Sequence, residues 1–174
     1  MKLLKYIGLV TILAACKGRI EQEIIVASPV DISDNEITNY VEYCNNRFDI
    51  CMNYPSNFNP EPEPTNGDGR VFSNKPDGAE IRIFGTTFSP RSQLEEIMQS
   101  MKKELEIYNL KQDKNRIEVF GFNKENNNLY HEILIIKKQA KSKNDELCSL
   151  SFTYPHAKRK KFKSYWRIIS NSFK

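Results

Sequence analysis

Cys16 is the residue whose chemistry the sequence indicates most directly, because it follows the tripeptide Leu13-Ala14-Ala15. A basic N-terminus and a short apolar run, residues 6–13, come before this tripeptide. These are the parts of a secretory signal peptide, and a cysteine placed directly after Leu-Ala-Ala makes the segment a bacterial lipobox. In a lipobox the thiol is diacylated, the chain is cut before the cysteine, and the freed amine is acylated. The sequence therefore predicts a signal peptide over residues 1–15 and a lipid anchor, palmitate or a similar chain, on Cys16.

The length of the apolar run decides between this interpretation and a retained membrane helix. A spanning helix needs about 20 apolar residues, and the run of residues 6–13 is much shorter. We therefore expect a lipoprotein of the bacterial cell envelope, attached to the membrane through its lipid. Lys17 follows the cysteine, in place of the aspartate that retains many lipoproteins in the inner membrane. In a host with two membranes, the periplasmic face of the outer membrane is the expected location.

Three further cysteines, Cys44, Cys51 and Cys148, remain in a chain that we expect to be exported. An odd number in an oxidising compartment predicts one disulfide and one thiol. Cys44 and Cys51 are close in sequence, with Asn45-Asn46 able to turn the chain between them. We favour Cys44–Cys148 with a buried, reduced Cys51, because that bridge would tie the first strand to a late one. On the chain-entropy model so long a loop contributes about 4–5 kcal/mol.

Metal and catalytic motifs give no positive signal in the sequence. The segment 66–69 (Asn-Gly-Asp-Gly) suggests a calcium loop, but Pro64 and Lys75 stand where that loop needs acidic ligands, so we expect a turn. His131 and His156 are the only histidines, and neither has partners at metal-site spacing. No nucleophile elbow, phosphate loop or zinc-protease motif is present. We therefore expect no cofactor, no metal and no enzymatic activity.

Charge gives one candidate binding feature, the basic run Lys158, Arg159, Lys160 and Lys161. It could contact lipid headgroups or an acidic partner, but we favour the solvated face of a helix. The formal net charge of +4 falls to about +2 when Lys2 and Lys5 leave with the signal peptide, which argues against nucleic acid as a partner. The long loop Ser56–Gly69 holds a Pro-Glu repeat over residues 60–64; it is a second candidate surface or, as we prefer for the repeat, a stiff spacer.

The elements that must position these residues follow from hydrophobic periodicity. Residues 16–42 have little periodicity and are predicted as the lipidated cysteine and a tether, with a short helical turn at 35–43. A single domain is expected over residues 43–174. Alternating apolar and polar residues predict its strands, which we place at residues 48–54, 70–73, 79–84, 117–122, 129–136 and 147–154.

Two stripes at three- and four-residue spacing predict amphipathic helices. The first runs from Pro90 to Tyr108, with Ser89 as its cap, and the second from Lys158 to Ser172. Strands of period two with two helices, and no regular strand–helix alternation, indicate an α+β fold. We expect a mainly antiparallel sheet covered by the two helices, with Trp166 largely buried.

Certain segments in this order resemble the PsbP-like fold, shared by the photosystem subunit PsbP, the Ran-binding Mog protein and the lipoprotein DcrB. The segments that carry the resemblance are 53–55 (Asn-Tyr-Pro), 66–72, 81–85, 151–155 and 169–173. The chain is also similar to small uncharacterised bacterial envelope proteins with this arrangement. The resemblance covers about residues 43–174 and implies a helix-covered antiparallel sheet without catalysis. It transfers no catalytic residue.

These observations favour a non-catalytic binding or structural domain with an envelope protein or glycan as its partner. An immunity or inhibitor protein that blocks a toxin or hydrolase is a special case. The alternative is a periplasmic hydrolase or small-ligand-binding protein whose site is assembled from residues distant in sequence.

Replacing Cys16 with alanine should abolish incorporation of labelled fatty acid, because the acylated thiol is lost. Fractionation of cells should then find the protein unprocessed or released from the membrane. Unchanged membrane association of the variant would contradict the predicted anchor.

Overall fold

The computed structural model describes residues 39–88, 92–139 and 144–174. The predicted signal peptide, Cys16 and most of the predicted tether lie outside these ranges, as do Ser89 and Pro90 at the predicted start of the first helix. In the described ranges, no helix has the length and apolar character needed to span a membrane.

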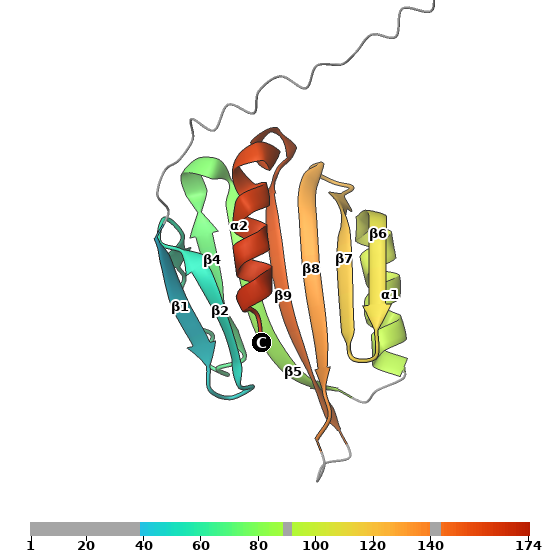
Figure 1. The fold of residues 1–174 in the computed structure, drawn as a ribbon. Helices are drawn as coiled ribbons and strands as arrows, with labels where there is room; N and C mark the ends of the chain where they lie inside the picture. The colour runs from blue at the N-terminus through green and yellow to red at the C-terminus, as the bar shows by residue number, and fades with distance from the viewer. Residues whose placement is uncertain (1–38, 89–91, 140–143) are drawn as a thin grey trace, which may run out of the picture. The chain divides into compact units, whose positions relative to one another are not determined.

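Seven antiparallel strands form the main sheet, in the spatial order β3-β4-β5-β9-β8-β7-β6 (Figure 1). Their bounds are β3 (Asn59–Pro60), β4 (Gly69–Asn74), β5 (Ala79–Phe88), β6 (Leu105–Asp113), β7 (Arg116–Asn123), β8 (Asn128–Lys137) and β9 (Asp145–Pro155). A separate antiparallel ribbon consists of β1 (Tyr40–Asn45) and β2 (Ile50–Pro55). The helices are α1 (Ser92–Glu104) and α2 (Arg159–Ser172), with short 3-10 turns at Lys75–Asp77 and His156–Lys158. The predicted α+β class with a mainly antiparallel sheet is confirmed.

Each face of the main sheet carries its own apolar cluster, because successive side chains of a strand point to opposite faces. We call the face toward the viewer of Figure 1 the front face; α2 and the β1–β2 ribbon lie on it. The back face packs against α1. In β8, Ile133 belongs to the front cluster and Leu134 to the back cluster. The sheet is therefore the middle layer of the domain.

The second helix forms where its stripe predicts, and it buries Phe162, Tyr165 and Ile169 against the front face. Trp166 is only half-buried, so the expectation of a largely buried tryptophan was wrong. The reason is its place on the helix. Trp166 lies at the margin of the buried stripe, on the side where the front face has no covering element in the described residues.

The first helix ends earlier than predicted, at Glu104, and β6 follows directly. In the sequence, Leu105 and Tyr108 fit the three- and four-residue spacing of the predicted helix, but in the structure both belong to β6. A β-bulge between Ile107 and Asn109 inserts Tyr108 as an extra residue opposite β7. The insertion breaks the alternation of this strand, so that its period-two pattern is hidden in the sequence.

The predicted helical turn at residues 35–43 was also wrong within the described residues, since Tyr40–Asn45 is a strand. Ring contacts hold it in place: Tyr40 lies 6.4 Å from Tyr165, and Tyr43 lies 5.2 Å from Phe72, between ring centroids. Pairing with β2 and these contacts outweigh a weak local preference. Residues 40–42, which were predicted as part of the tether, therefore belong to a strand.

The disulfide joins Cys44 to Cys51, so the expected Cys44–Cys148 pairing and the reduced Cys51 were wrong. The two cysteines are directly opposite in the β1–β2 register, with their Cα atoms 4.1 Å apart. Cys148 lies on β9 in the front cluster, fully buried and reduced. Burial raises the pKa of its thiol to about 11, which makes it an unreactive core residue.

The short loop closed by this disulfide predicts a modest stabilisation. Replacing both Cys44 and Cys51 with serine should lower the free energy of unfolding by about 2–3 kcal/mol, less than the 4–5 expected of a long loop. Urea denaturation of the parent and the double variant measures the difference. Peptide mass analysis without reduction should show the same Cys44–Cys51 pair in the parent and in Cys148→Ser. A Cys44–Cys148 pair in the parent would contradict the assignment.

Candidate functional site

Part of the front face is open. The β1–β2 ribbon lies over β4 and β5, and α2 lies over β9, whereas no described element covers the front of β6 and β7 (Figure 1). A hollow of about 240 Å³ lies in this open area beside α2. It is lined by Asn109, Lys111, Glu118, Val119, Phe120, His131, Glu132 and Trp166. These residues come from β6, β7, β8 and α2, so only the fold brings them together.

Aromatic rings form the surface in and around this hollow. His131 stacks against Trp166 with ring centroids 4.9 Å apart, and Phe120 lies 4.7 Å from His131 on the other side. Tyr108 meets Phe122 edge-on at 5.2 Å, and its side chain is 61% exposed. We call these five residues the aromatic platform. Edge-on and stacked pairs at such distances stabilise one another, which makes the platform a defined surface.

Sequence reasoning missed the platform, and it had assigned His131 to an ordinary strand position. A usable signal was present in β7, where Phe120 and Phe122 alternate with Val119 and Gly121 and so share one face of the strand. What the pattern did not contain was which face of β7 would remain uncovered.

His131 is held neutral within the platform. Burial is the main reason that the pKa of His131 is lowered to about 4, and the positive charge of Arg159 adds to this effect. Its Nε2 atom shares a hydrogen bond of 3.0 Å with the Tyr154 hydroxyl, whose own pKa burial raises to about 12. Neither group is therefore charged near neutral pH, and the platform presents a neutral, apolar surface there.

Glu132 is next to His131 in β8, but its carboxyl group lies on the opposite face of the sheet. The Tyr130 hydroxyl donates a 2.7 Å hydrogen bond to Glu132 Oε2, and Tyr130 packs against the back cluster. The side chain is only 7% exposed, and burial raises the pKa of Glu132 to about 7. Adjacent strand residues point to opposite faces, so that Glu132 and His131 do not form an acid–base pair.

The basic run divides between the two sides of α2. Lys158 and Lys161 both bind Asp77, with N–O distances of 3.1 and 2.8 Å. The hydrogen bond from Lys161, supported by that from Lys158, holds the pKa of Asp77 below its usual value. Arg159 lies seven residues before Trp166 on the same helical stripe, and its charge acts on His131. The structure thus brings Arg159 to the platform and directs Lys158 and Lys161 to Asp77, while Lys160 is exposed.

The Ser56–Gly69 segment is bound to the domain along its length. Phe58 is buried in the front cluster, and β3 pairs with β4. Arg70 donates a 2.8 Å hydrogen bond to the Glu61 carbonyl inside the Pro-Glu repeat. Gly67 has a φ of 64°, as the predicted turn requires. The segment is therefore part of the framework, and its Pro-Glu repeat lies against an edge of the sheet.

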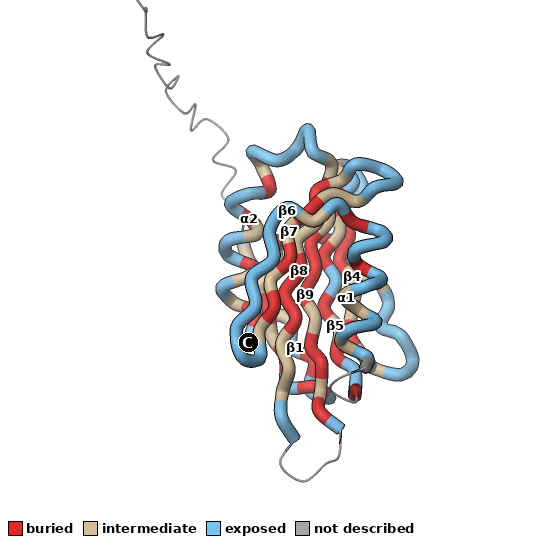
Figure 2. Tube along the Cα trace, turned by 90° about the vertical axis from the view of Figure 1, so that its right-hand side faces the viewer, coloured by how far each residue is buried: buried red, intermediate tan, exposed pale blue. Residues whose placement is uncertain are grey.

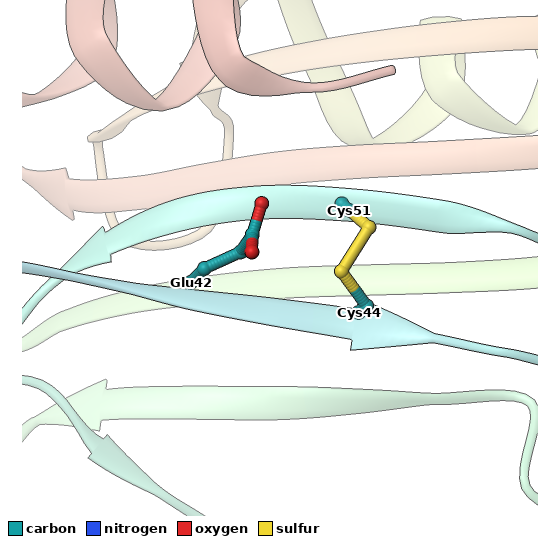
Figure 3. A group of neighbouring side chains, drawn as sticks. All are labelled: Glu42, Cys44 and Cys51. Atoms are coloured by element: carbon teal, nitrogen blue, oxygen red, sulfur yellow. A yellow bond between two sulfur atoms is a disulfide. The ribbon is translucent and has the colours of Figure 1, made fainter.

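Two other places have some features of a site. Glu42, Cys44 and Cys51 have ligand-type atoms within 4.8 Å of one another (Figure 3). The two sulfurs are joined as a disulfide, and a metal needs the thiolate, so this group does not supply a metal site. A broader hollow of about 400 Å³ lies beside α1, lined by Leu94, Glu95, Met98, Gln99, Lys102, Gln112 and Ile117. Its polar residues are exposed, and it lacks the ring packing of the platform.

Comparison with known proteins tests the fold. No protein-family model matches the sequence, and no curated protein matches it either. The solution structure of cyanobacterial PsbP (CyanoP) from Synechocystis sp. PCC 6803 superposes with a TM-score of 0.54 at 11% identity, covering 79% of this chain and 92% of that one. The fold is PsbP-like.

The crystal structure of the Saccharomyces cerevisiae Ran-binding protein Mog1p gives a TM-score of 0.49 at 10% identity, covering 79% of this chain and 95% of that one. The superposition on CyanoP establishes the PsbP-like arrangement of sheet and helices, and an identity of 11% establishes nothing about activity. The predicted similarity to bacterial envelope lipoproteins stays a prediction.

The stacking of His131 on Trp166, the only tryptophan, makes the platform observable by fluorescence. A protonated imidazole quenches a neighbouring indole, so emission from the chain should fall on acidification. The midpoint should lie near pH 4, since burial lowers the pKa of His131 to about 4, and not near the ordinary value of about 6.5. His131→Gln should remove the step, and His156→Gln should keep it.

Circular dichroism of the same samples separates quenching from acid unfolding. A midpoint near pH 6.5, or a step that survives in His131→Gln, would contradict this description of the site.

Proposed function

We propose that this chain is a lipid-anchored protein of the bacterial cell envelope whose domain binds a partner through the aromatic platform and catalyses no reaction. The lipobox ending at Cys16 supports the location. The open platform supports the binding role, because exposed apolar patches on an otherwise solvated surface mark interaction sites. An envelope protein or a glycan is the proposed partner, and an immunity or inhibitor protein is a special case.

The single observation that carries this proposal is the size and build of the front hollow. Sites for small ligands usually enclose about 300–1,000 Å³, and this hollow measures about 240 Å³. It can accept one side chain or one sugar ring, while the rings around it supply a wider contact area. Such a surface suits a partner that inserts one group and lays the rest across the platform.

The ionisable groups near the hollow favour binding over the hydrolase alternative. His131 is bonded to Tyr154, Glu132 to Tyr130 on the other face, and Glu118 to Arg116 at 2.8 Å. Each of these three groups has its own partner, and they do not converge on one point. General acid–base catalysis needs groups within reach of the same substrate. The alternative would require substrate binding to rearrange these pairs.

Trp166→Ala should remove partner binding, because it deletes the ring beside the hollow. The parent and the variant would be used as baits for affinity capture from native envelope extracts, followed by binding measurements with the purified partner. Ile168→Ala is the matched control, since Ile168 is an exposed apolar residue on the same helix and lies away from the hollow. Truncation of a buried aromatic anchor at an interface typically weakens binding by about 2 kcal/mol or more.

Arg159→Glu provides a second variant that leaves the buried rings in place. It should weaken binding of an acidic partner, and circular dichroism should show an unchanged fold. If Trp166→Ala and Ile168→Ala bind the partner equally, the platform is not the recognition surface. Turnover of a substrate by the parent would favour the hydrolase alternative.

A further inference from the structure

The strand β6 ends the main sheet on the side of the open face. In the sheet order it has one neighbour, β7, and its residues from Tyr108 to Asp113 are all exposed. Figure 2 views the molecule from this side, with β6 as a largely exposed strand in the foreground and α1 and α2 to either side of it. The outer backbone groups of a nine-residue edge strand are a template for pairing with another strand.

Exposed apolar side chains accompany these backbone groups. Four large hydrophobic residues are exposed in the described part of the chain, and two of them, Tyr108 at 61% and Leu110 at 44%, lie on β6. The other two, Val41 and Ile168, lie on different elements. The free edge is therefore also where exposed apolar area is concentrated.

The residues before the bulge in β6 are complementary to the residues after it. Tyr108 is the inserted residue, so that Ile107 and Leu110 both point to the back face, and Glu106 and Lys111 both point to the front face. Turning the strand by 180° about the Tyr108–Asn109 position exchanges Ile107 with Leu110 and Glu106 with Lys111. The part of β6 before the bulge and the part after it thus each carry one apolar and one charged residue, and the two charges are opposite in sign.

From this match we propose that two copies of the chain associate through β6, which pairs with itself in antiparallel fashion about a two-fold axis at Tyr108–Asn109. An isologous contact of this kind needs a self-complementary surface. Glu106 of each copy then faces Lys111 of the other on the front, and Ile107 faces Leu110 on the back. Both front faces stay on the same side of the joined sheet, and the two aromatic platforms become neighbours.

The register follows from the same residues. Sliding one copy by two positions toward the strand end would place Glu106 opposite Asp113, two like charges, and would separate Ile107 from Leu110. Like charges directly opposite one another destabilise strand pairing, and opposite charges stabilise it. A slide by one position would put side chains of opposite faces in register. Of these registers, the one centred at Tyr108–Asn109 satisfies both the charges and the apolar pairs.

Charge reversal with rescue tests this contact directly. Sedimentation equilibrium of the chain 16–174 carrying Cys16→Ser, which has no lipid to drive association, should show a monomer–dimer equilibrium. Lys111→Glu and Glu106→Lys should each weaken the dimer about tenfold or more, because each places two like-charge pairs in the contact. The double variant Glu106→Lys/Lys111→Glu should restore the dimer. Lys114→Glu makes the same charge change in the β6–β7 turn and should leave it intact.

A cross-link tests the position of the axis. Asn109→Cys places a thiol beside its own copy, and mild oxidation should produce a disulfide-linked dimer, whereas Lys114→Cys should not. Both positions are exposed, so neither change disturbs the core. A monomer at all concentrations, or a dimer that responds equally to Lys114→Glu and Lys111→Glu, would overturn the proposal. Lys111 and Asn109 also line the hollow, so the effect of dimer loss on partner binding is measured with Glu106→Lys, which leaves Trp166 and the residues of the hollow in place.

Discussion

The pairing of β9 with β5 on one side and β8 on the other is the interaction on which this domain depends. In the sheet order, β9 is what connects the β3–β5 strands to the β6–β8 strands. Its Phe152 is fully buried and contacts the rings of Phe58 and Phe162, from the Ser56–Gly69 segment and α2. The β3–β5 strands and the β6–β8 strands can therefore join into one sheet only when residues 145–155 have paired with both groups. Such long-range pairing has a high cost in loop closure and slows folding.

Burial on both faces around β9 constrains the polar residues next to it. His131 lies opposite Phe152 and Glu132 opposite Ser151 in the β8–β9 register. With one side chain on each face, both are withdrawn from water, and each keeps one hydroxyl partner, Tyr154 or Tyr130. Burial lowers the pKa of His131 and raises that of Glu132, so between about pH 4 and 7 both are held uncharged. Two adjacent titratable residues thus serve the packing of two clusters, and their closeness in sequence indicates no shared chemistry.

Most of the fold was predictable because its strands alternate cleanly. The strand segments 79–84, 117–122, 129–136 and 147–154, and α2, are where periodicity placed them, and the PsbP-like resemblance gave their arrangement. The errors in the strands arose where the structure depends on a contact that is distant in sequence or on an irregularity. The bulge at Tyr108 disguised β6, and ring contacts from Tyr40 and Tyr43 set β1. The disulfide error has another origin: Cys44 and Cys51 lie opposite each other in a local hairpin, whereas the expectation favoured a bridge to the distant Cys148.

The platform was unpredictable for a different reason: it is defined by the part of the sheet that the described residues leave uncovered. Seven strands about 4.8 Å apart span roughly 29 Å, whereas a helix about 10 Å wide covers about two strands. The β1–β2 ribbon lies over β4 and β5, so in the described residues the front of β6 and β7, at one end of the sheet, has no covering element. At this uncovered end the residues cannot be fully buried, and aromatic rings that pack on one another, as His131 does on Trp166 and Phe120, keep water from most of their area. Under the proposed function, a partner docked on the platform would supply the missing layer, which favours the open end of the sheet over the basic run and the Pro-Glu repeat as the place for recognition.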